Sequence, residues 1–249
     1  MISPRRPARS AEDGFGLVEL MISVSVFGLI MSLVVGLLIT AQKQTASTII
    51  RLDDVDQARM AIDSLSRTVR TAVEPAQLQV GCTSCNGPAS TSTALTSAQP
   101  STIQLFANGG SAAGPSLVTF SVSYDAAREQ GTLTRTVQPP DVGSAPNFTY
   151  TACTIGTAGC LITSLPIVRG LQWPLPGALF TYYSNAGAPL TPPAGASLPP
   201  QQLISVDSIA INLAVKTTNP YHTGPTTIAS RVGLPNAGSG VLATPAPTP

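Results

Sequence analysis

A single carboxylate, Glu19, lies at the start of an apolar segment that carries no other charge until Lys43. An ionised group inside a bilayer costs about 2.5–3.5 kcal/mol on insertion scales, and such groups are usually kept for a function. Burial of a carboxylate is offset when a cation pairs with it, and the segment itself supplies no cation. Glu19 is therefore the first candidate functional residue, and ion pairing is the chemistry we expect of it.

Four cysteines form the second candidate group. They come in two close pairs, Cys82 with Cys85 and Cys153 with Cys160, in surroundings rich in Gly, Ser and Thr. Pairs of this kind form disulfides, bind zinc or exchange disulfides, and a redox pair would open a helix, of which the residues around Cys82 show no sign. Four cysteines allow three pairings. We expect two structural disulfides with local pairing, and zinc binding and redox chemistry are the alternatives.

The sequence offers little for catalysis or for a metal site. His222 is the only histidine, and it lies in a turn sequence, Asn-Pro-Tyr-His-Thr-Gly-Pro. A metal centre or a His-based catalytic system is hard to assemble from one histidine. The chain also contains no nucleophile elbow and no phosphate-binding loop. We predict that the protein is not an enzyme and that it holds no cofactor and no metal.

Composition narrows the function classes further. The 249 residues suffice for one or two domains, only 10% of them are charged, and the formal net charge is +1. Such a chain has no basic surface for nucleic acid, so we predict no nucleic-acid partner. The 23 Pro and 21 Gly indicate short strands joined by turn-rich loops.

The element that positions Glu19 is an N-terminal apolar helix. Residues 20–42, about 23 without a charge, span about 34 Å as a helix, and a hydrocarbon core is about 30 Å thick. Three arginines within residues 5–9 precede the segment, against Lys43 and Arg51 beyond it, which favours a cytoplasmic N-terminus. We therefore predict a single span of the cytoplasmic (inner) membrane, with the C-terminal domain outside.

The residues before this helix differ from an ordinary signal peptide. Polar residues 10–14 precede the apolar segment, whereas a signal peptide is cut after its apolar segment. Residues 14–19, Gly-Phe-Gly-Leu-Val-Glu, follow a short basic leader and begin an uninterrupted apolar helix. This combination resembles the cleavage and methylation signal of type IV prepilins and type II secretion pseudopilins. Gly16 departs from the pattern, since Thr is common at its position.

The resemblance implies a processing site and an assembly contact. A membrane-embedded prepilin peptidase would cut after Gly14 and methylate the new amine of Phe15. Glu19 would then lie about one turn from that terminus and pair with the N-terminal amine of a neighbouring subunit. The partners would be other pilins or pseudopilins, bound through this helix in a pilus or pseudopilus. The alternative interpretation is a signal anchor in which Glu19 reaches the membrane interface.

Small residues support close packing of this helix. Gly28, Ser32 and Gly36 recur every four residues and place small side chains on one helix face, which lets membrane helices approach closely. Gly36 stands where many major pilins carry a helix-kinking proline.

The helical pattern continues beyond the membrane segment as an amphipathic half. Apolar residues recur at alternating three- and four-residue spacing, with charged residues, Asp54 among them, at other positions. The apolar stripe comprises Val55, Ala58, Ile62, Leu65, Val69 and Ala72. The pattern predicts a helix to about Val73, because Glu74 precedes a proline and is disfavoured in a helix.

After Pro75 the sequence predicts a mainly antiparallel sheet. The expected strands are 102–106, 117–124, 132–137, 148–150, 161–165, 178–183, 205–215 and 227–234, with the second and third forming a hairpin. The apolar helix stripe would cover this sheet, which gives an α+β, pilin-like fold. Residues 187–200 are expected to form a surface loop.

These elements divide the chain into five expected parts. They are the leader 1–14, the transmembrane half of the helix 15–42, its amphipathic half 43–74, the β-rich extracytoplasmic domain 75–242 and a Pro-rich disordered tail 243–249. The order of segments 133–135, 179–187, 204–215 and 231–236 resembles larger minor pilins of the PilW-like group and J-type pseudopilins. The function implied is that of a minor pilin in pilus assembly or priming. The alternatives are a type II secretion pseudopilin and a membrane-anchored surface binding domain that never polymerises.

Overall fold

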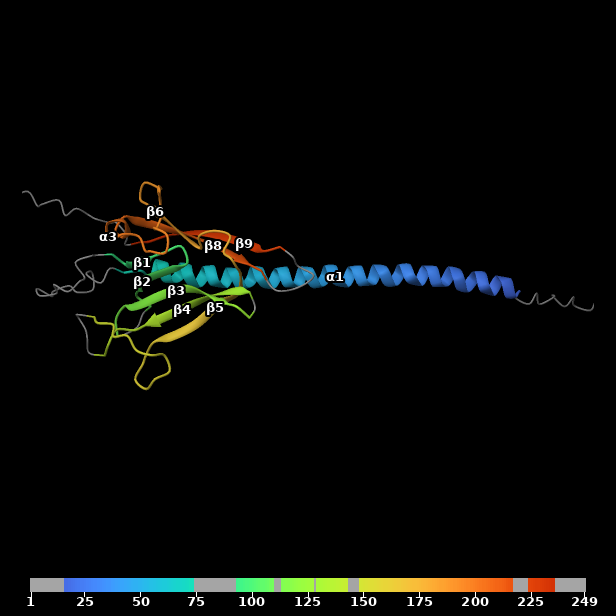
Figure 1. Cartoon of the computed structure of the whole chain (residues 1–249), viewed down its shortest axis with the longest axis horizontal. Helices are drawn as coiled ribbons and strands as arrows, with labels where there is room; N and C mark the ends of the chain where they lie inside the picture. The colour runs from blue at the N-terminus through green and yellow to red at the C-terminus, as the bar shows by residue number, and fades with distance from the viewer. Residues whose placement is uncertain are drawn as a thin grey trace, which may run out of the picture. The chain divides into compact units, whose positions relative to one another are not determined.

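The computed structural model describes residues 16–73, 93–109, 113–127, 129–142, 148–216 and 224–235. These residues form one long helix, one short helix and a nine-stranded sheet (Figure 1). The predicted leader, the pair Cys82 and Cys85, and the Pro-rich tail lie outside the described residues. The chain divides into two compact units, Met1–Thr48 and Ile49–Pro249, which we call the N-terminal and C-terminal units.

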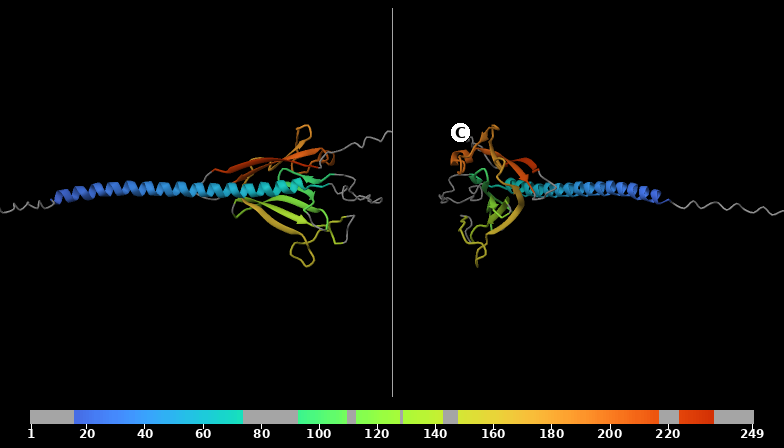
Figure 2. Two further views of the ribbon diagram at one scale, coloured as in Figure 1. Left: turned by 180° about the vertical axis from the view of Figure 1, so that it is seen from behind. Right: turned by 45° about the vertical axis from the view of Figure 1, so that its right-hand side comes forward.

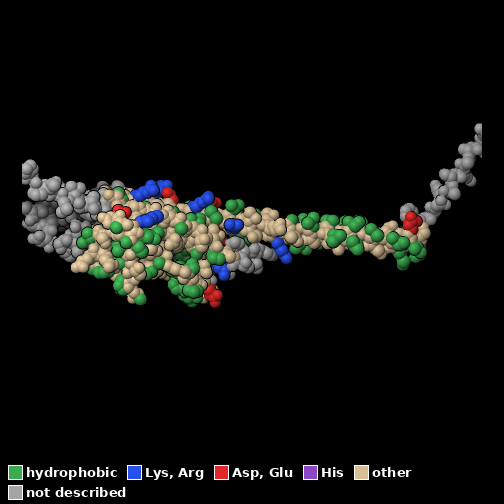
Figure 3. Space-filling view, turned by 90° about the horizontal axis from the view of Figure 1, so that it is seen from above, with side chains coloured by type: hydrophobic (Ala, Val, Ile, Leu, Met, Phe, Trp, Pro, Cys, Tyr) green, Lys and Arg blue, Asp and Glu red, His purple; other side chains and the backbone are tan. Residues whose placement is uncertain are grey.

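The long helix α1 runs from Leu17 to Arg70 and contributes to both units. In the N-terminal unit its side chains are mostly apolar up to Ala41, and every described residue from Gly16 to Thr45 is exposed. Figure 3 shows hydrophobic side chains distributed along this part. Among the described helices, α1 is the one that is long and apolar enough to cross a membrane.

The second part of α1 buries one stripe in the core of the C-terminal unit. The buried residues are Asp54, Ala58, Ala61, Leu65 and Val69, and Ala72 continues the stripe just past the helix. The predicted stripe was correct in period but placed to one side, since Val55 and Ile62 are only half-buried. Asp54 was expected among the polar positions, and that prediction was wrong because its side chain is fully buried.

Nine strands form one antiparallel sheet in the order β1-β2-β3-β4-β5-β8-β6-β7, and β9 pairs with β8. Their bounds are β1 Leu95–Ala98, β2 Thr102–Ala107, β3 Ser116–Asp125, β4 Gln130–Gln138, β5 Thr163–Gln172, β6 Phe180–Ser184, β7 Pro189–Leu190, β8 Val206–Val215 and β9 Thr226–Gly233. In β2 and the first half of β3 buried residues alternate with half-buried ones, as one covered face requires. The α+β fold predicted from the sequence is confirmed.

Helix α1 is tied to the sheet where it ends. The Val73 N–H donates to the Phe106 carbonyl at 3.0 Å, and the Asn108 N–H donates to the Thr71 carbonyl at 2.8 Å. The chain leaving α1 therefore makes a short antiparallel bridge with β2. The helix ends at Arg70, three residues before the predicted end. The N–H groups of Thr71 and Ala72 still donate to helix carbonyls, and Val73 is the first residue whose N–H donates to the strand.

The sheet bends sharply where β5 meets β8. Only Leu171 and Val215 pair between these strands. The Lys216 N–H donates to the Gly170 carbonyl at 2.7 Å, and Gln130 Nε2 donates to the Lys216 carbonyl at 3.0 Å. As a result β6, β8 and β9 lie on one side of the second part of α1, and β3, β4 and β5 lie on the other (Figures 1 and 2).

The turn between β1 and β2 joins the two sides at the opposite edge. The Phe180 N–H donates to the Pro100 carbonyl and the Leu198 N–H donates to the Ala98 carbonyl, both at 3.0 Å. The Tyr182 hydroxyl donates to the Gln99 carbonyl at 2.8 Å. The sheet is thus curled around the buried stripe of α1, with one narrow junction at each side.

Most predicted strands are confirmed with shifts of one or two residues at their ends. Residues 148–150 were predicted as a strand and have none, while β5 begins later and runs longer than 161–165. The sequence did not predict β1. The expected loop 187–200 contains β7 and the start of the short helix α3, Pro200–Leu203, and Leu198 within it is buried.

We predict that Tyr182→Phe lowers the free energy of unfolding by about 1 kcal/mol, because the Gln99 carbonyl loses its hydroxyl donor. Tyr182 is fully buried, and burial raises the pKa of its hydroxyl, so the group acts as a neutral donor. Urea unfolding of the full chain in detergent measures the change. Tyr183→Phe is the matched control, since that neighbour is only half-buried; equal losses in both variants would contradict the prediction.

Candidate assembly site on the N-terminal helix

Glu19 occupies the first turn of α1 and is exposed. An acidic side chain is stabilising there, because the N-terminal end of a helix carries a partial positive charge. The Leu20 N–H donates to the Gly16 carbonyl at 3.2 Å, so Gly16 directly precedes the first helical residue, Leu17. Glu19 is therefore within the first turn of the helix, where that partial charge is located.

The rest of the N-terminal segment is suited to a hydrocarbon environment, because it is uncharged and most of its hydroxyl groups are hydrogen-bonded within the helix. Among its described residues up to Gln42, Glu19 is the only charged one. The hydroxyl groups of Ser23, Ser25 and Thr40 donate to carbonyls four residues earlier, at 2.7–2.9 Å. These bonds satisfy the hydroxyls within the helix, as a medium without water requires. The segment needs lipid or other helices to cover its apolar surface.

The small residues Gly28, Ser32 and Gly36 lie on one side of this segment and are exposed. Apart from the adjacent backbone of α1 itself, no atom of the described residues lies within 4 Å of the place where a Cβ would stand on either glycine. The helix continues through Gly36 without interruption. Their predicted role in helix packing would involve another molecule and stays a prediction.

The processing site, Gly14 and Phe15, lies outside the described residues. Its role and the pairing role of Glu19 therefore stay predictions of the sequence.

The comparisons with known proteins bear on this same segment. Residues 9–35 match the family model described as the prokaryotic N-terminal methylation motif. No curated protein and no solved structure matches the chain. The motif, the apolar helix and the α+β architecture together support a type IV pilin-like protein. The motif implies processing by a prepilin peptidase and assembly with other pilins.

In the C-terminal unit the structure joins Cys153 to Cys160 by a disulfide, with their Cα atoms 5.7 Å apart. The bridge closes an exposed loop in which Gly156 and Gly159 have φ values of +89° and +84°. Only glycine adopts such values readily, so these residues let the loop turn tightly. The local pairing predicted for these two cysteines is present, and the pairing of Cys82 with Cys85 stays a prediction.

A polar cluster beside the disulfide loop was not predicted. Asp141 accepts hydrogen bonds from the Thr149 hydroxyl at 2.7 Å, from the Thr151 N–H at 3.1 Å and from the Thr151 hydroxyl at 2.8 Å. These bonds lower the pKa of Asp141. The neighbouring Tyr150 hydroxyl donates to the Pro115 carbonyl. Burial raises the pKa of Tyr150 to about 12. Residues 148–150 were expected to form a strand. They instead belong to a loop that the hydrogen bonds to Asp141 stabilise.

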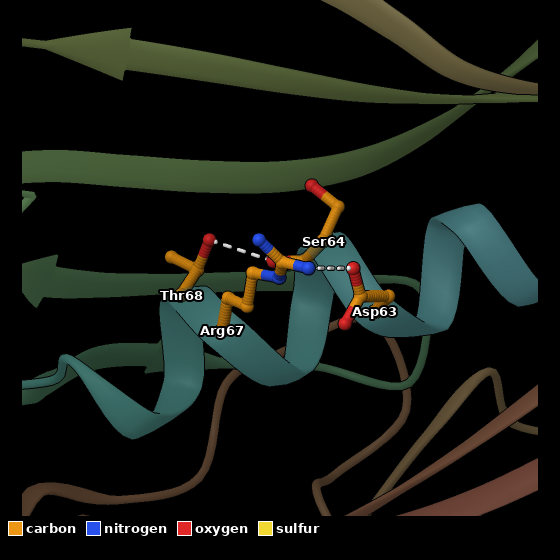
Figure 4. A network of polar contacts seen from close by, with 4 residues as sticks. All are labelled: Asp63, Ser64, Arg67 and Thr68. Atoms are coloured by element: carbon orange, nitrogen blue, oxygen red, sulfur yellow. Dashed lines mark hydrogen bonds and ion pairs between the residues drawn. The ribbon is translucent and has the colours of Figure 1, made fainter.

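A groove of about 380 Å³ lies in the C-terminal unit between α1 and β9. Arg59, Arg67 and Arg70 line it on the helix side and residues 228–230 on the strand side. Arg67 forms an ion pair with Asp63 at 2.8 Å on the exposed face of the helix (Figure 4). From the sequence these arginines could be predicted to lie on the polar side of the helix. That β9 lies beside them follows only from the fold.

The described part of the chain contains no group of three or more His, Cys, Asp or Glu residues that could hold a metal ion.

Proposed function

We propose that this protein is a minor pilin, a structural subunit of a type IV pilus-like filament that takes part in pilus assembly or priming after prepilin peptidase cleavage. The observation that carries the proposal is the methylation motif at residues 9–35, which includes the start of α1, where Glu19 is the only charged residue up to Gln42. Its role is structural rather than enzymatic. The proposed domain organisation is the one predicted from the sequence: a leader that is removed by cleavage after Gly14, the two halves of the helix, the β-rich domain and the Pro-rich tail.

In this proposal the charge of Glu19 serves assembly. Cleavage creates an amine on Phe15, and the Glu19 of one subunit pairs with the amine of a neighbour as their helices pack. The pair offsets part of the cost of placing two charges in the membrane. The small residues Gly28, Ser32 and Gly36 let the helices approach closely enough for this contact.

The proposed location is the inner membrane, crossed once, with the N-terminus in the cytoplasm and the C-terminal unit outside. The arginines before the apolar segment support this orientation. The disulfide between Cys153 and Cys160 supports it independently, because disulfides persist in oxidising compartments and are rare in the cytosol.

A type II secretion pseudopilin is the second candidate within the same class, since the motif and the fold suit both systems. A surface binding domain that is anchored by the same helix but never polymerises is the candidate from a different class. The binding-domain candidate does not need Phe15 as a free, methylated terminus, so the N-terminus of the mature chain separates it from the filament proposals.

The test is the intact mass of the protein extracted from membranes and from sheared surface filaments. We expect a chain that begins at N-methylated Phe15 in both fractions. A mature protein that still begins at Met1 would refute the filament proposal. A processed chain that appears only in cells with an assembled secretion pseudopilus, and never in pili, would favour the pseudopilin.

A further inference from the structure

Apart from Arg51 and the buried Asp54, the charged residues in the second part of α1 lie on one face. With 3.6 residues per turn, they fall within about 120° of arc, on the side of the helix opposite the buried stripe. They are all exposed: Asp53, Asp56, Arg59, Asp63, Arg67 and Arg70. Because the sheet packs on the opposite side, this face is available to another molecule.

Two pairs of like charge lie at the two ends of this face, with Arg59 and Asp63 between them. An acidic pair, Asp53 and Asp56, comes first, and a basic pair, Arg67 and Arg70, comes near the end of the helix. Both pairs have the same three-residue spacing. Each arginine follows its corresponding aspartate by 14 residues, which is close to four complete helical turns, or about 21 Å along the axis.

The two pairs cannot meet within one straight helix because of this separation. Within the described residues, the ion pair on this face is Arg67 with Asp63, and their side chains are 78% and 58% exposed. Exposed pairs of this type contribute little and exchange partners easily. The basic pair can therefore accept a carboxylate from outside at little cost.

The groove beside Arg67 and Arg70 favours the binding of an acidic group. The groove between α1 and β9 is lined by three arginines and one aspartate, which leaves an excess of positive charge. Ser66 adds a hydroxyl donor to this lining. Strand β9 pairs only with β8 among the described strands. The other edge of β9 is therefore unpaired, and no further described strand closes the groove.

We propose that this charged face binds the same face of a second copy of the chain. The two helices lie parallel and are shifted by about 21 Å, so that Asp53 and Asp56 of one copy meet Arg67 and Arg70 of the other. The equal spacing of the two pairs lets both contacts form at one shift. The inference rests on the proposed filament function, and it requires at least two copies in one filament.

This contact joins a different neighbour from the Glu19 contact. A pair between Glu19 and the amine of Phe15 needs a shift of about one turn, or about 5 Å. The charged face needs about four turns. A subunit surrounded by several others can form both contacts, each with a different neighbour. Each contact then fixes the axial position of the subunit independently.

A charge swap tests the proposal in cells that make the full chain. Arg67→Glu with Arg70→Glu, and separately Asp53→Arg with Asp56→Arg, are each expected to reduce the filament fraction about tenfold, since two modest attractions become repulsions. The chain with all four changes should recover to within about twofold of wild type, because the pairs are restored with reversed sign. Sheared filaments and membrane pools are quantified by immunoblot.

The matched control is Arg51→Glu with Arg169→Glu, the same change in charge at exposed positions off this face. It should enter filaments like wild type. Urea midpoints equal to wild type show that each variant is folded. Double variants that behave like this control, or a folded four-change chain that stays excluded, would overturn the inference.

Cross-linking provides the geometric test. Differently tagged copies carrying Asp53→Cys and Arg67→Cys are expected to form an intermolecular disulfide in filaments, whereas two copies carrying Asp53→Cys are not. If wild type enters filaments but neither the swap nor the cross-link behaves as expected, only this inference fails. If wild type never enters filaments, the proposed function fails with it.

Discussion

Gly14→Ala is expected to leave nearly all of the protein as an uncut precursor in the membrane. The residue before the cut is part of the methylation motif at residues 9–35, and a glycine there presents the peptide bond to the peptidase without a side chain. The added methyl group would obstruct that approach. Filaments should then lack the protein, because the Phe15 amine never forms.

The measurement is the ratio of precursor to mature mass in membrane extracts. Gly16→Ala is the matched control, since the same methyl group is added two residues later, where the structure has open space around the glycine. That variant should be cut and methylated normally. Normal processing of Gly14→Ala would contradict cleavage at this junction.

Glu19→Gln is expected to abolish or strongly reduce incorporation into filaments while leaving the protein inserted and folded. The change removes the negative charge but keeps the size of the side chain, so the helix and the C-terminal unit are unaffected. The Phe15 amine of the neighbour then enters the membrane without a counter-charge, which costs several kcal/mol. Glu19→Asp, shorter by one methylene, should be intermediate.

Fractionation of sheared filaments against membrane pools measures this effect. Glu129→Gln makes the same chemical change at an exposed turn in the C-terminal unit and should assemble normally. Efficient entry of Glu19→Gln into filaments would refute the pairing role for subunits that have neighbours above them. A subunit at the very tip has no such neighbour and would tolerate the change, so the copies that still enter should then be confined to filament ends.

The helix and most strands could be predicted from the sequence because their patterns are local. In α1 the change from a continuous apolar run to a spaced stripe reports where the surroundings change. In β2 and β3 the alternation of apolar and polar residues reports one covered face. Glu19 could be found in the same way, since one charge in a long apolar run is visible without any contact.

Asp54, Ile62 and Val55 show where local pattern fails. The apolar residues nearest in sequence suggested a stripe through Val55 and Ile62, yet the sheet curls so that Asp54 and Ala61 face the core instead. The side of a helix that is buried depends on partners far along the chain. A buried carboxylate in particular cannot be recognised until those partners are in place.

What the sequence determined by itself is the processing motif, the apolar helix with its single charge, and the amphipathic half that follows. Each of these depends on spacing within a few helical turns. The tertiary structure alone decided that β8 lies between β5 and β6, that four residues of modest strand tendency form β1, and that β9 borders the arginines of α1. Those outcomes depend on hydrogen bonds and packing between segments as much as about 170 residues apart, and no short stretch of sequence carries the free energy of such contacts.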